Sequence, residues 1–219
     1  MPETIADQVR AMREARAGTP PDPARAAYAH DRERLAADGV PHGAIGVGDL
    51  IPDTDLLDSK GQPLTLSAAL ENRPGVLVFY RGAWCPYCNI ALRTYQAQLL
   101  PMLRRRAVGL VAVSPQRPDA SLSLAEKEAL EFPVLSDPGL ILARHLGIAY
   151  TPPPDVIAAN LGRGLDVSAT SADGTDAVPM PATVVLDADR LVRWVDVHPD
   201  YSTRSEVADI LTAVDSMPT

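Results

Sequence analysis

A continuous apolar run from Gly75 to Tyr80 leads within five residues into two cysteines that stand three positions apart, Cys85 and Cys88. Such a run is typical of a central parallel strand that is buried on both faces. The residues after the second cysteine follow a helical period. The sequence therefore predicts a strand, a tight turn and a helix, with both thiols at the turn. These are the only cysteines among the 219 residues.

The rest of the pattern predicts an α/β domain in which a central mixed sheet is flanked by helices. Other strands are expected over residues 108–113, 132–137, 182–187 and 191–197, the last two as a hairpin, and helices over 66–70, 89–106, 123–131, 140–146 and 207–214. We find no internal repeat and no linker that would divide this region into two domains.

Residues 1–45 form a helical extension in this prediction, followed by one domain over residues 46–219. Ile5, Val9 and Met12 recur at the spacing of one helix face. The stretch Thr19–Pro23 breaks this helix, and a second helix follows before Asp38-Gly39. Residues 151–177 are rich in Pro, Gly and Asp and are expected to form an irregular insertion with a functional or mobile role.

Composition narrows the possible functions. The formal net charge of −8 and the lack of a basic stripe argue against a nucleic-acid surface. No apolar run approaches the roughly 20 residues of a membrane span, and the first residues do not read as a secretory signal. Because both cysteines lie in one C-x-x-C, none is left for a disulfide framework, which favours a reducing, cytoplasmic setting and a redox-active pair.

Four segments resemble those of a known family. Residues 79–88, with Trp84 and the C-P-Y-C sequence, resemble the active-site strand and helix start of thioredoxin-like proteins. Residues 132–139 and the tail at 200–204 look like the alkyl hydroperoxide reductase/thiol-specific antioxidant family, the peroxiredoxins. Residues 180–187 resemble the thioredoxin-fold segment that holds a cis-proline, here Pro181, before a strand. The resemblance covers about residue 47 to the C-terminus and implies a thioredoxin-like fold.

The chain departs from the peroxiredoxin pattern Pro-x-x-x-Thr-x-x-Cys. Arg81 stands at the proline, Cys85 at the threonine and Cys88 at the peroxidatic cysteine. The family's arginine before the later strand would fall near Met180, so it is also missing at that place. The sequence resembles a peroxiredoxin relative that carries a thioredoxin-type cysteine pair.

Two orders of attack follow from the resemblance. A helix N-terminus favours a thiolate, because its unpaired N–H groups and dipole are positive. By thioredoxin analogy Cys85 attacks and Cys88 closes the disulfide. By peroxiredoxin analogy Cys88 becomes the sulfenic acid and Cys85 resolves it. The sequence leaves both orders open, although access favours Cys85.

Five neighbouring residues are expected to support the pair. Pro86 suits the first helical turn, and together with Tyr87 it tunes the redox potential. Trp84 either packs in the core or contacts substrate. Arg81 either lowers a thiol pKa or stabilises a peroxide-derived oxyanion, unless it is a surface arginine. Pro181 either carries a cis peptide opposite the thiols or simply begins a strand.

The leading hypothesis is a thiol-dependent oxidoreductase that reduces peroxides with an external thioredoxin- or glutathione-type reductant and needs no bound cofactor. The alternatives are a reductase of protein or small disulfides and a non-catalytic thioredoxin-fold binding module. A zinc site needs about four ligands, and the four histidines show no ligand spacing, so no metal is expected. The helical extension suggests a lid or a homodimer contact.

Overall fold

The computed structural model describes residues 3–15, 22–118 and 129–218. Its centre is a seven-stranded mixed sheet in the order β2-β1-β5-β4-β3-β8-β9. The strands are β1 (Asp55–Leu57), β2 (Pro63–Thr65), β3 (Gly75–Phe79), β4 (Gly109–Ser114), β5 (Val134–Ser136), β8 (Ala182–Leu186) and β9 (Val192–Val197). Strand β3 pairs in parallel with β4 and antiparallel with β8. The mixed sheet and the β8–β9 hairpin confirm the prediction.

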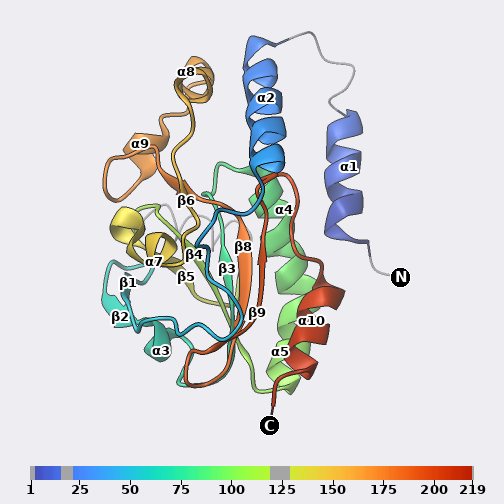
Figure 1. Cartoon of the computed structure of the whole chain (residues 1–219), viewed down its shortest axis with the longest axis vertical. Helices are drawn as coiled ribbons and strands as arrows, with labels where there is room; N and C mark the ends of the chain where they lie inside the picture. The colour runs from blue at the N-terminus through green and yellow to red at the C-terminus, as the bar shows by residue number, and fades with distance from the viewer. Residues whose placement is uncertain (1–2, 16–21, 119–128, 219) are drawn as a thin grey trace.

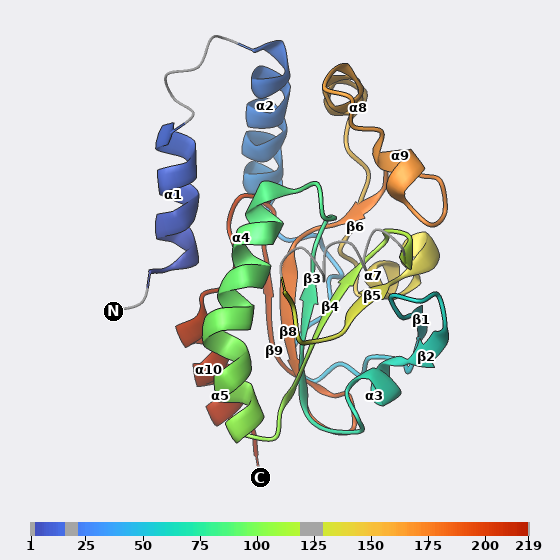
Figure 2. The same ribbon diagram turned by 180° about the vertical axis from the view of Figure 1, so that it is seen from behind.

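The two faces of β3 belong to two separate hydrophobic clusters. Val76 and Val78 pack in one cluster, whereas Leu77 and Phe79 pack in the other. This division follows from the alternation of side chains along a strand. Helices cover both faces, with α4, α5 and α10 on one side and α3 and α7 on the other (Figures 1 and 2). The apolar run is therefore buried on both sides, as the sequence predicts.

One long helical stretch follows the cysteines. It comprises α4 (Pro86–Thr94), a π-helical turn (Tyr95–Leu99) and α5 (Leu100–Arg105). The π turn is explained by Pro101, which has no N–H for the bond to the carbonyl four residues earlier and would crowd that turn. The shorter helices are α3 (Leu66–Ala69), α7 (Ile141–His145) and α10 (Val207–Asp215), close to the predicted positions.

The predicted N-terminal helices are present as α1 (Ile5–Ala15) and α2 (Pro23–Asp38). Ile5 and Val9 are buried against the cluster that contains α4, and Met12 packs partly against it, so the helix face expected from spacing is confirmed. The breaker at Thr19–Pro23 and the helix predicted at 123–131 lie largely outside the described residues.

The segment 151–177 differs from the prediction, because it holds two helices, α8 (Pro154–Gly162) and α9 (Val167–Thr170). The prolines at 152–154 mark a helix start and not a break, since proline is tolerated in the first turn. Strands β6 (Ala149–Tyr150) and β7 (Val178–Pro179) pair antiparallel and bring the two ends of the segment together. The insertion is therefore a helical segment whose two ends are paired with each other.

The expectation of a cis bond at Pro181 is wrong, because the described residues contain no cis peptide bond. Pro181 lies between β7 and β8, where the chain runs extended from one strand to the next and a trans bond suffices.

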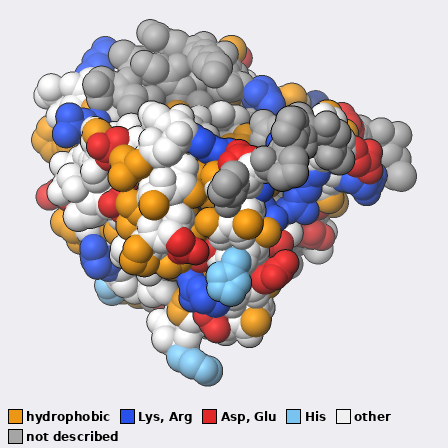
Figure 3. Space-filling view, turned by 90° about the horizontal axis from the view of Figure 1, so that it is seen from above, with side chains coloured by type: hydrophobic (Ala, Val, Ile, Leu, Met, Phe, Trp, Pro, Cys, Tyr) orange, Lys and Arg blue, Asp and Glu red, His pale blue; other side chains and the backbone are white. Residues whose placement is uncertain are grey.

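Among the described residues, no helix is both long enough and apolar enough to cross a membrane. On the face drawn in Figure 3, acidic and basic side chains are interspersed and form no extended basic field.

Candidate active site

The strand register explains which loops meet at the cysteines. Phe79 at the end of β3 pairs with Ala182 at the start of β8, and Ala182 pairs with Val197 at the end of β9. Three segments therefore meet at the same end of these strands: the loop to Cys85, Pro181 and residues 198–205. Residues 198–205 thus lie beside the thiols, although they are more than a hundred residues away in sequence.

The two thiols lie side by side at the start of α4. Cys85 is the N-cap and Cys88 is in the first turn, and both are reduced and buried, with 1% and 0% of their surface exposed. The guanidinium of Arg204 lies 2.9 Å from Sγ of Cys88 and 3.9 Å from Sγ of Cys85. A buried cation therefore contacts both sulfurs and lies closer to Cys88.

The surroundings drive the pKa values of the two thiols apart. Burial raises the pKa of Cys88, but the hydrogen bond from Cys85, the charge of Arg204 and the backbone N–H of Arg81 outweigh it, so the pKa lies well below the ordinary value. Burial and the neighbouring Cys88 thiolate raise the pKa of Cys85. Both directions, together with the shorter distance from Arg204 to Cys88, favour a thiolate at Cys88 over one at Cys85.

Arg204 is held in place by the loop that carries it. One of its terminal nitrogens donates to the carbonyl of Tyr201 at 2.8 Å and also to that of Thr203. The phenol of Tyr95, from the π turn, donates to the carbonyl of Ser205 at 2.7 Å. These contacts leave the other terminal nitrogen to face the sulfurs, and they link the helix after the cysteines to the arginine loop.

Arg81 is a second cation whose charge acts on Cys85. Only 6% of its surface is exposed, and its guanidinium lies 4.0 Å from the ring centre of Tyr201 and 5.1 Å from that of Trp84. The indole of Trp84 packs over Gly82, where an added Cβ would fall 2.5 Å from Nε1. The turn before the cysteines thus requires a glycine, and Arg81 is buried and not a surface residue.

A cavity of about 180 Å³ opens at Cys85. Its walls come from the cysteine turn, from α2 and α8, and from Tyr201; Cys88 is not part of the lining. Two helices outside the predicted core, one from the extension and one from the insertion, therefore shape the space that a substrate would enter. Pro86, Tyr87, Trp84 and Arg81 all line it, whereas Pro181 does not.

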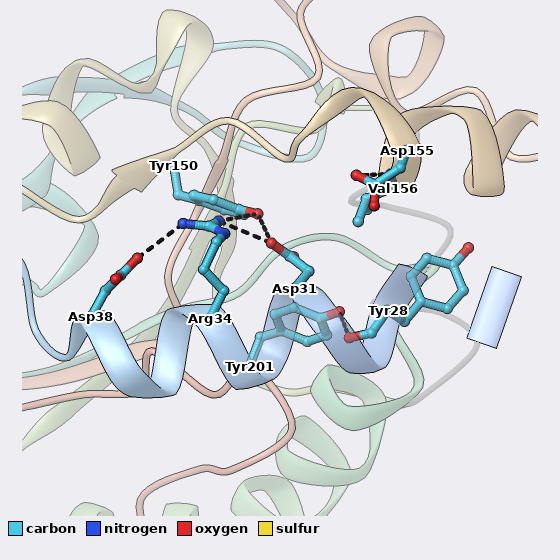
Figure 4. Close-up of polar contacts among 8 residues, drawn as sticks. All are labelled: Tyr28, Asp31, Arg34, Asp38, Tyr150, Asp155, Val156 and Tyr201. Atoms are coloured by element: carbon cyan, nitrogen blue, oxygen red, sulfur yellow. Dashed lines mark hydrogen bonds and ion pairs between the residues drawn. The ribbon is translucent and has the colours of Figure 1, made fainter. Parts of the chain in front are cut away.

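Helix α2 is fixed over this region by polar contacts (Figure 4). The phenol of Tyr150 donates to Asp31 at 2.5 Å, and Arg34 donates to the same carboxylate oxygen at 3.0 Å. The phenol of Tyr201 donates to the carbonyl of Tyr28 at 3.0 Å (Figure 4). The side chain of Tyr28 in turn donates to Asn160 of α8 at 2.8 Å. The extension and the insertion are thus joined above the cavity.

Comparison with known proteins decides the family. The family model described as AhpC/TSA family matches residues 47–195, which is more than half of the chain. The chain belongs to the AhpC/TSA family. Both cysteines and Arg81 fall within the matched range, whereas α1, α2 and Arg204 lie outside it.

Two curated relatives come from strains of Mycobacterium tuberculosis, CDC 1551 and H37Rv, and each bears the name "Putative peroxiredoxin". Each is 32% identical to this chain over 103 residues, which is 46% of this AhpC/TSA chain and 65% of the relative. The match thus spans somewhat less than two thirds of the length of these relatives.

Solved structures support the thioredoxin-like fold of the family. The crystal structure of peroxidoxin BcpB from Mycobacterium tuberculosis superimposes with a TM-score of 0.61 at 23% identity, covering 80% of this chain and 99% of that one. Reduced Prx3 from Vibrio vulnificus, solved in complex with H2O2, gives 0.62 at 19% identity, covering 78% and 99%.

Sequence reasoning identified the thiols but missed the cation beside them. Arg204 lies within a segment that resembled the family, yet its role depends on the sheet register and not on any local motif. Tyr28, Arg32 and Arg163 were missed for the same reason, since α2 and α8 were not expected to meet over Cys85. Within the described residues, no group of three or more His, Cys, Asp or Glu side chains is arranged to hold a metal ion.

Proposed function

We propose that this AhpC/TSA chain is a thiol peroxidase in which Cys88 attacks the peroxide and Cys85 resolves the product. The observation that carries the proposal is the contact of Arg204 with Cys88 at 2.9 Å, because a buried guanidinium stabilises a thiolate and the nucleophile in peroxide reduction is the thiolate. Membership of the family supports the same activity.

The two thiols divide the chemistry. The Cys88 thiolate attacks the terminal peroxide oxygen, the O–O bond breaks, and Cys88 becomes a sulfenic acid. The Cys85 thiol stands where the family pattern has threonine and supplies the proton that turns the leaving oxygen into water or an alcohol. The Cys85 thiolate then attacks the sulfenic sulfur, and the hydroxide that leaves takes a proton from solvent as the disulfide forms.

A small disulfide is the second candidate substrate. It is favoured by one observation, that Cys85 and not Cys88 lines the cavity, as an attacking cysteine of the thioredoxin type would. A protein disulfide fits less well, because the 1% exposure of Cys85 leaves little sulfur surface for a bulky partner. An external thiol of the thioredoxin or glutathione type would return the oxidised pair to the dithiol.

The assignment is tested by trapping the oxidised sulfur. Reduced Cys85→Ser and Cys88→Ser are mixed with hydrogen peroxide and a sulfenic-acid reagent, and the modified residue is located by mass spectrometry. We expect rapid labelling of Cys88 in Cys85→Ser and slow labelling of Cys85 in Cys88→Ser.

The reverse result would reassign the attack to Cys85 while leaving the peroxidase activity in place. If neither variant reacts faster than free cysteine, while the wild type rapidly reduces insulin or a small disulfide, the peroxidase proposal fails.

A further inference from the structure

Two residues that line the cavity at Cys85 each have a buried donor without a partner among the described residues. Nε of Arg81 and Nε1 of Trp84 are both fully buried atoms, and neither has a hydrogen-bond acceptor among the described residues. Both residues line the cavity. Buried donors without partners are rare in folded proteins, because each carries a desolvation penalty. Because both atoms are closed off from water, an acceptor reaches them only when the side chains around the cavity shift as a ligand binds, and such an acceptor would remove the penalty.

The charge of the lining points to an anion. Three arginines, Arg32, Arg81 and Arg163, line the cavity, and none of its lining residues is acidic. Arg163 is paired with Asp22, whereas neither Arg32 nor Arg81 forms an ion pair among the described residues. An excess of positive charge around one cavity stands out on a chain whose net charge is −8, and it would attract an anionic substrate.

The remaining walls suit an apolar body of limited size. Tyr28, Trp84, Tyr87 and Tyr201 contribute aromatic rings, and Leu165 adds an aliphatic wall. The volume of about 180 Å³ is below the range of roughly 300–1,000 Å³ for drug-sized ligands. It is slightly larger than the roughly 150 Å³ that accommodates a benzene molecule. One ring or a short chain with a small polar group therefore fits.

We propose that this cavity selects small organic hydroperoxides that carry a carboxylate, with the carboxylate at Arg81 and Arg32 and the peroxide group at Cys85, the thiol of the pair that lines the cavity. This inference rests on the proposed peroxidase function and adds a substrate class to it. The reaction is the one written above, with the alcohol of the acid as product in place of one water, and the external thiol supplies the two electrons that restore the dithiol.

Turnover with matched substrates provides the first test. Cumene hydroperoxide is compared with its para-carboxylate and with the methyl ester of that acid, which has a similar size but no charge. We expect kcat/KM for the carboxylate to exceed that for the ester by about tenfold or more, as for a charge-assisted hydrogen bond. The advantage should fall to near unity in Arg81→Gln and decrease in Arg32→Gln. It should persist in Arg105→Gln, an exposed arginine at the far end of α5.

Binding without turnover provides the second test. Neither para-isopropylbenzoate nor the corresponding benzamide can be reduced by thiols, and their affinities for the reduced wild type are measured by calorimetry. We expect the benzoate to bind more tightly, with Arg32→Gln weakening it. Because Arg32 is only partly buried, this variant remains informative if Arg81→Gln does not fold.

Equal kcat/KM values for the acid and the ester, with hydrogen peroxide still reduced rapidly, would overturn this inference and leave the peroxidase function intact. Preference for the benzoate without reduction of any peroxide would overturn the hydroperoxide assignment together with the proposed function. The alternative is that the arginines recognise the reductant. If Arg81→Gln and Arg32→Gln changed only the KM of a carboxylate-bearing thiol reductant, and not kcat/KM for the hydroperoxide, the proposal that the cavity binds the hydroperoxide would be wrong.

Discussion

At the scale of single residues, the arrangement of Arg204 and the two sulfurs accounts for the reactivity we propose. The guanidinium is nine-tenths buried and contacts Cys88 more closely than Cys85. The pKa of Cys88 is lowered and that of Cys85 is raised. A depressed pKa means that the thiolate persists as the pH falls, until the pH passes below that pKa. Cys88 should therefore stay reactive in conditions where an ordinary cysteine is protonated.

Replacing Arg204 by methionine should remove this advantage. We expect the pKa of Cys88 to rise, because burial then acts on the thiolate without a compensating cation. At a pH below the ordinary pKa of cysteine, alkylation of Cys88 in a Cys85→Ser background should slow by about tenfold or more. The measurement is the pH dependence of the iodoacetamide reaction, and Arg204→Lys, which keeps the charge, should retain part of the rate. An unchanged pH profile in Arg204→Met would contradict the role of this residue.

Gly82 sets the geometry of the turn before the cysteines. Its φ is +153°, and an added Cβ would fall 2.5 Å from the indole nitrogen of Trp84. We expect Gly82→Ala to displace the indole and to lower the free energy of unfolding by about 1–3 kcal/mol. Gly162→Ala is the matched control, because nothing lies within 4 Å of its Cβ position. Chemical denaturation measures both; equal stability of the two variants would show that the turn tolerates a side chain.

At the scale of elements, two groups of prolines show which helix features the sequence could predict and which it could not. Pro101 interrupts the hydrogen bonding of a helix that the apolar spacing correctly predicts, and a π turn results. The prolines at 152–154 precede a helix, although their density suggests an irregular segment. Local composition identifies where proline occurs, but whether it breaks or begins a helix depends on what that helix packs against, here α2.

Helix α2 forms part of the cavity wall, and Asp31 anchors it. Asp31 is buried and shares Arg34 with Asp38, whose side chain is exposed (Figure 4). We expect Asp31→Asn to destabilise the protein by about 1–3 kcal/mol, because the charge that accepts from Tyr150 and Arg34 is lost. Asp38→Asn should cost about 0.5 kcal/mol or less.

Hydrogen exchange of α2 and denaturation curves provide the measurement for this pair of variants. Faster exchange should be confined to Asp31→Asn. If both variants behave alike, the buried contact does not fix the helix over the cavity.

Helix α1 is attached both by its apolar face and at its N-terminus. Ile5 is 1% exposed, and the backbone N–H groups of Ile5 and Ala6 donate to the carboxylate of Glu206 at 3.0 and 2.8 Å. We expect Ile5→Ala to lower the free energy of unfolding by about 2–4 kcal/mol. The exposed Glu14 on the same helix provides a control, since Glu14→Ala should change it by about 0.5 kcal/mol or less. A stability loss for Ile5→Ala no larger than the control's would show that α1 is not docked.

At the scale of the whole molecule, the order and pairing of the strands bring the residues of the site together. The continuous apolar run predicted the central strand, and the C-x-x-C predicted the redox pair at its end. Arg204 lies on the loop that follows β9. Because Phe79 pairs with Ala182 and Ala182 pairs with Val197, this loop leaves the sheet at the same end as the cysteine turn. Only the sheet register reveals this, because no local pattern at residue 204 refers to residue 88. The cavity walls depend in the same way on the contact between α2 and α8.

The most direct test of the central claim is the rate at which one equivalent of hydrogen peroxide converts the fully reduced wild type to the Cys85–Cys88 disulfide. Stopped-flow fluorescence gives the rate, and intact mass identifies the product. We predict that the disulfide forms with a rate constant far above that of free cysteine, and that the rate falls as the pH drops through the depressed pKa of Cys88. A reaction no faster than that of free cysteine would contradict the account.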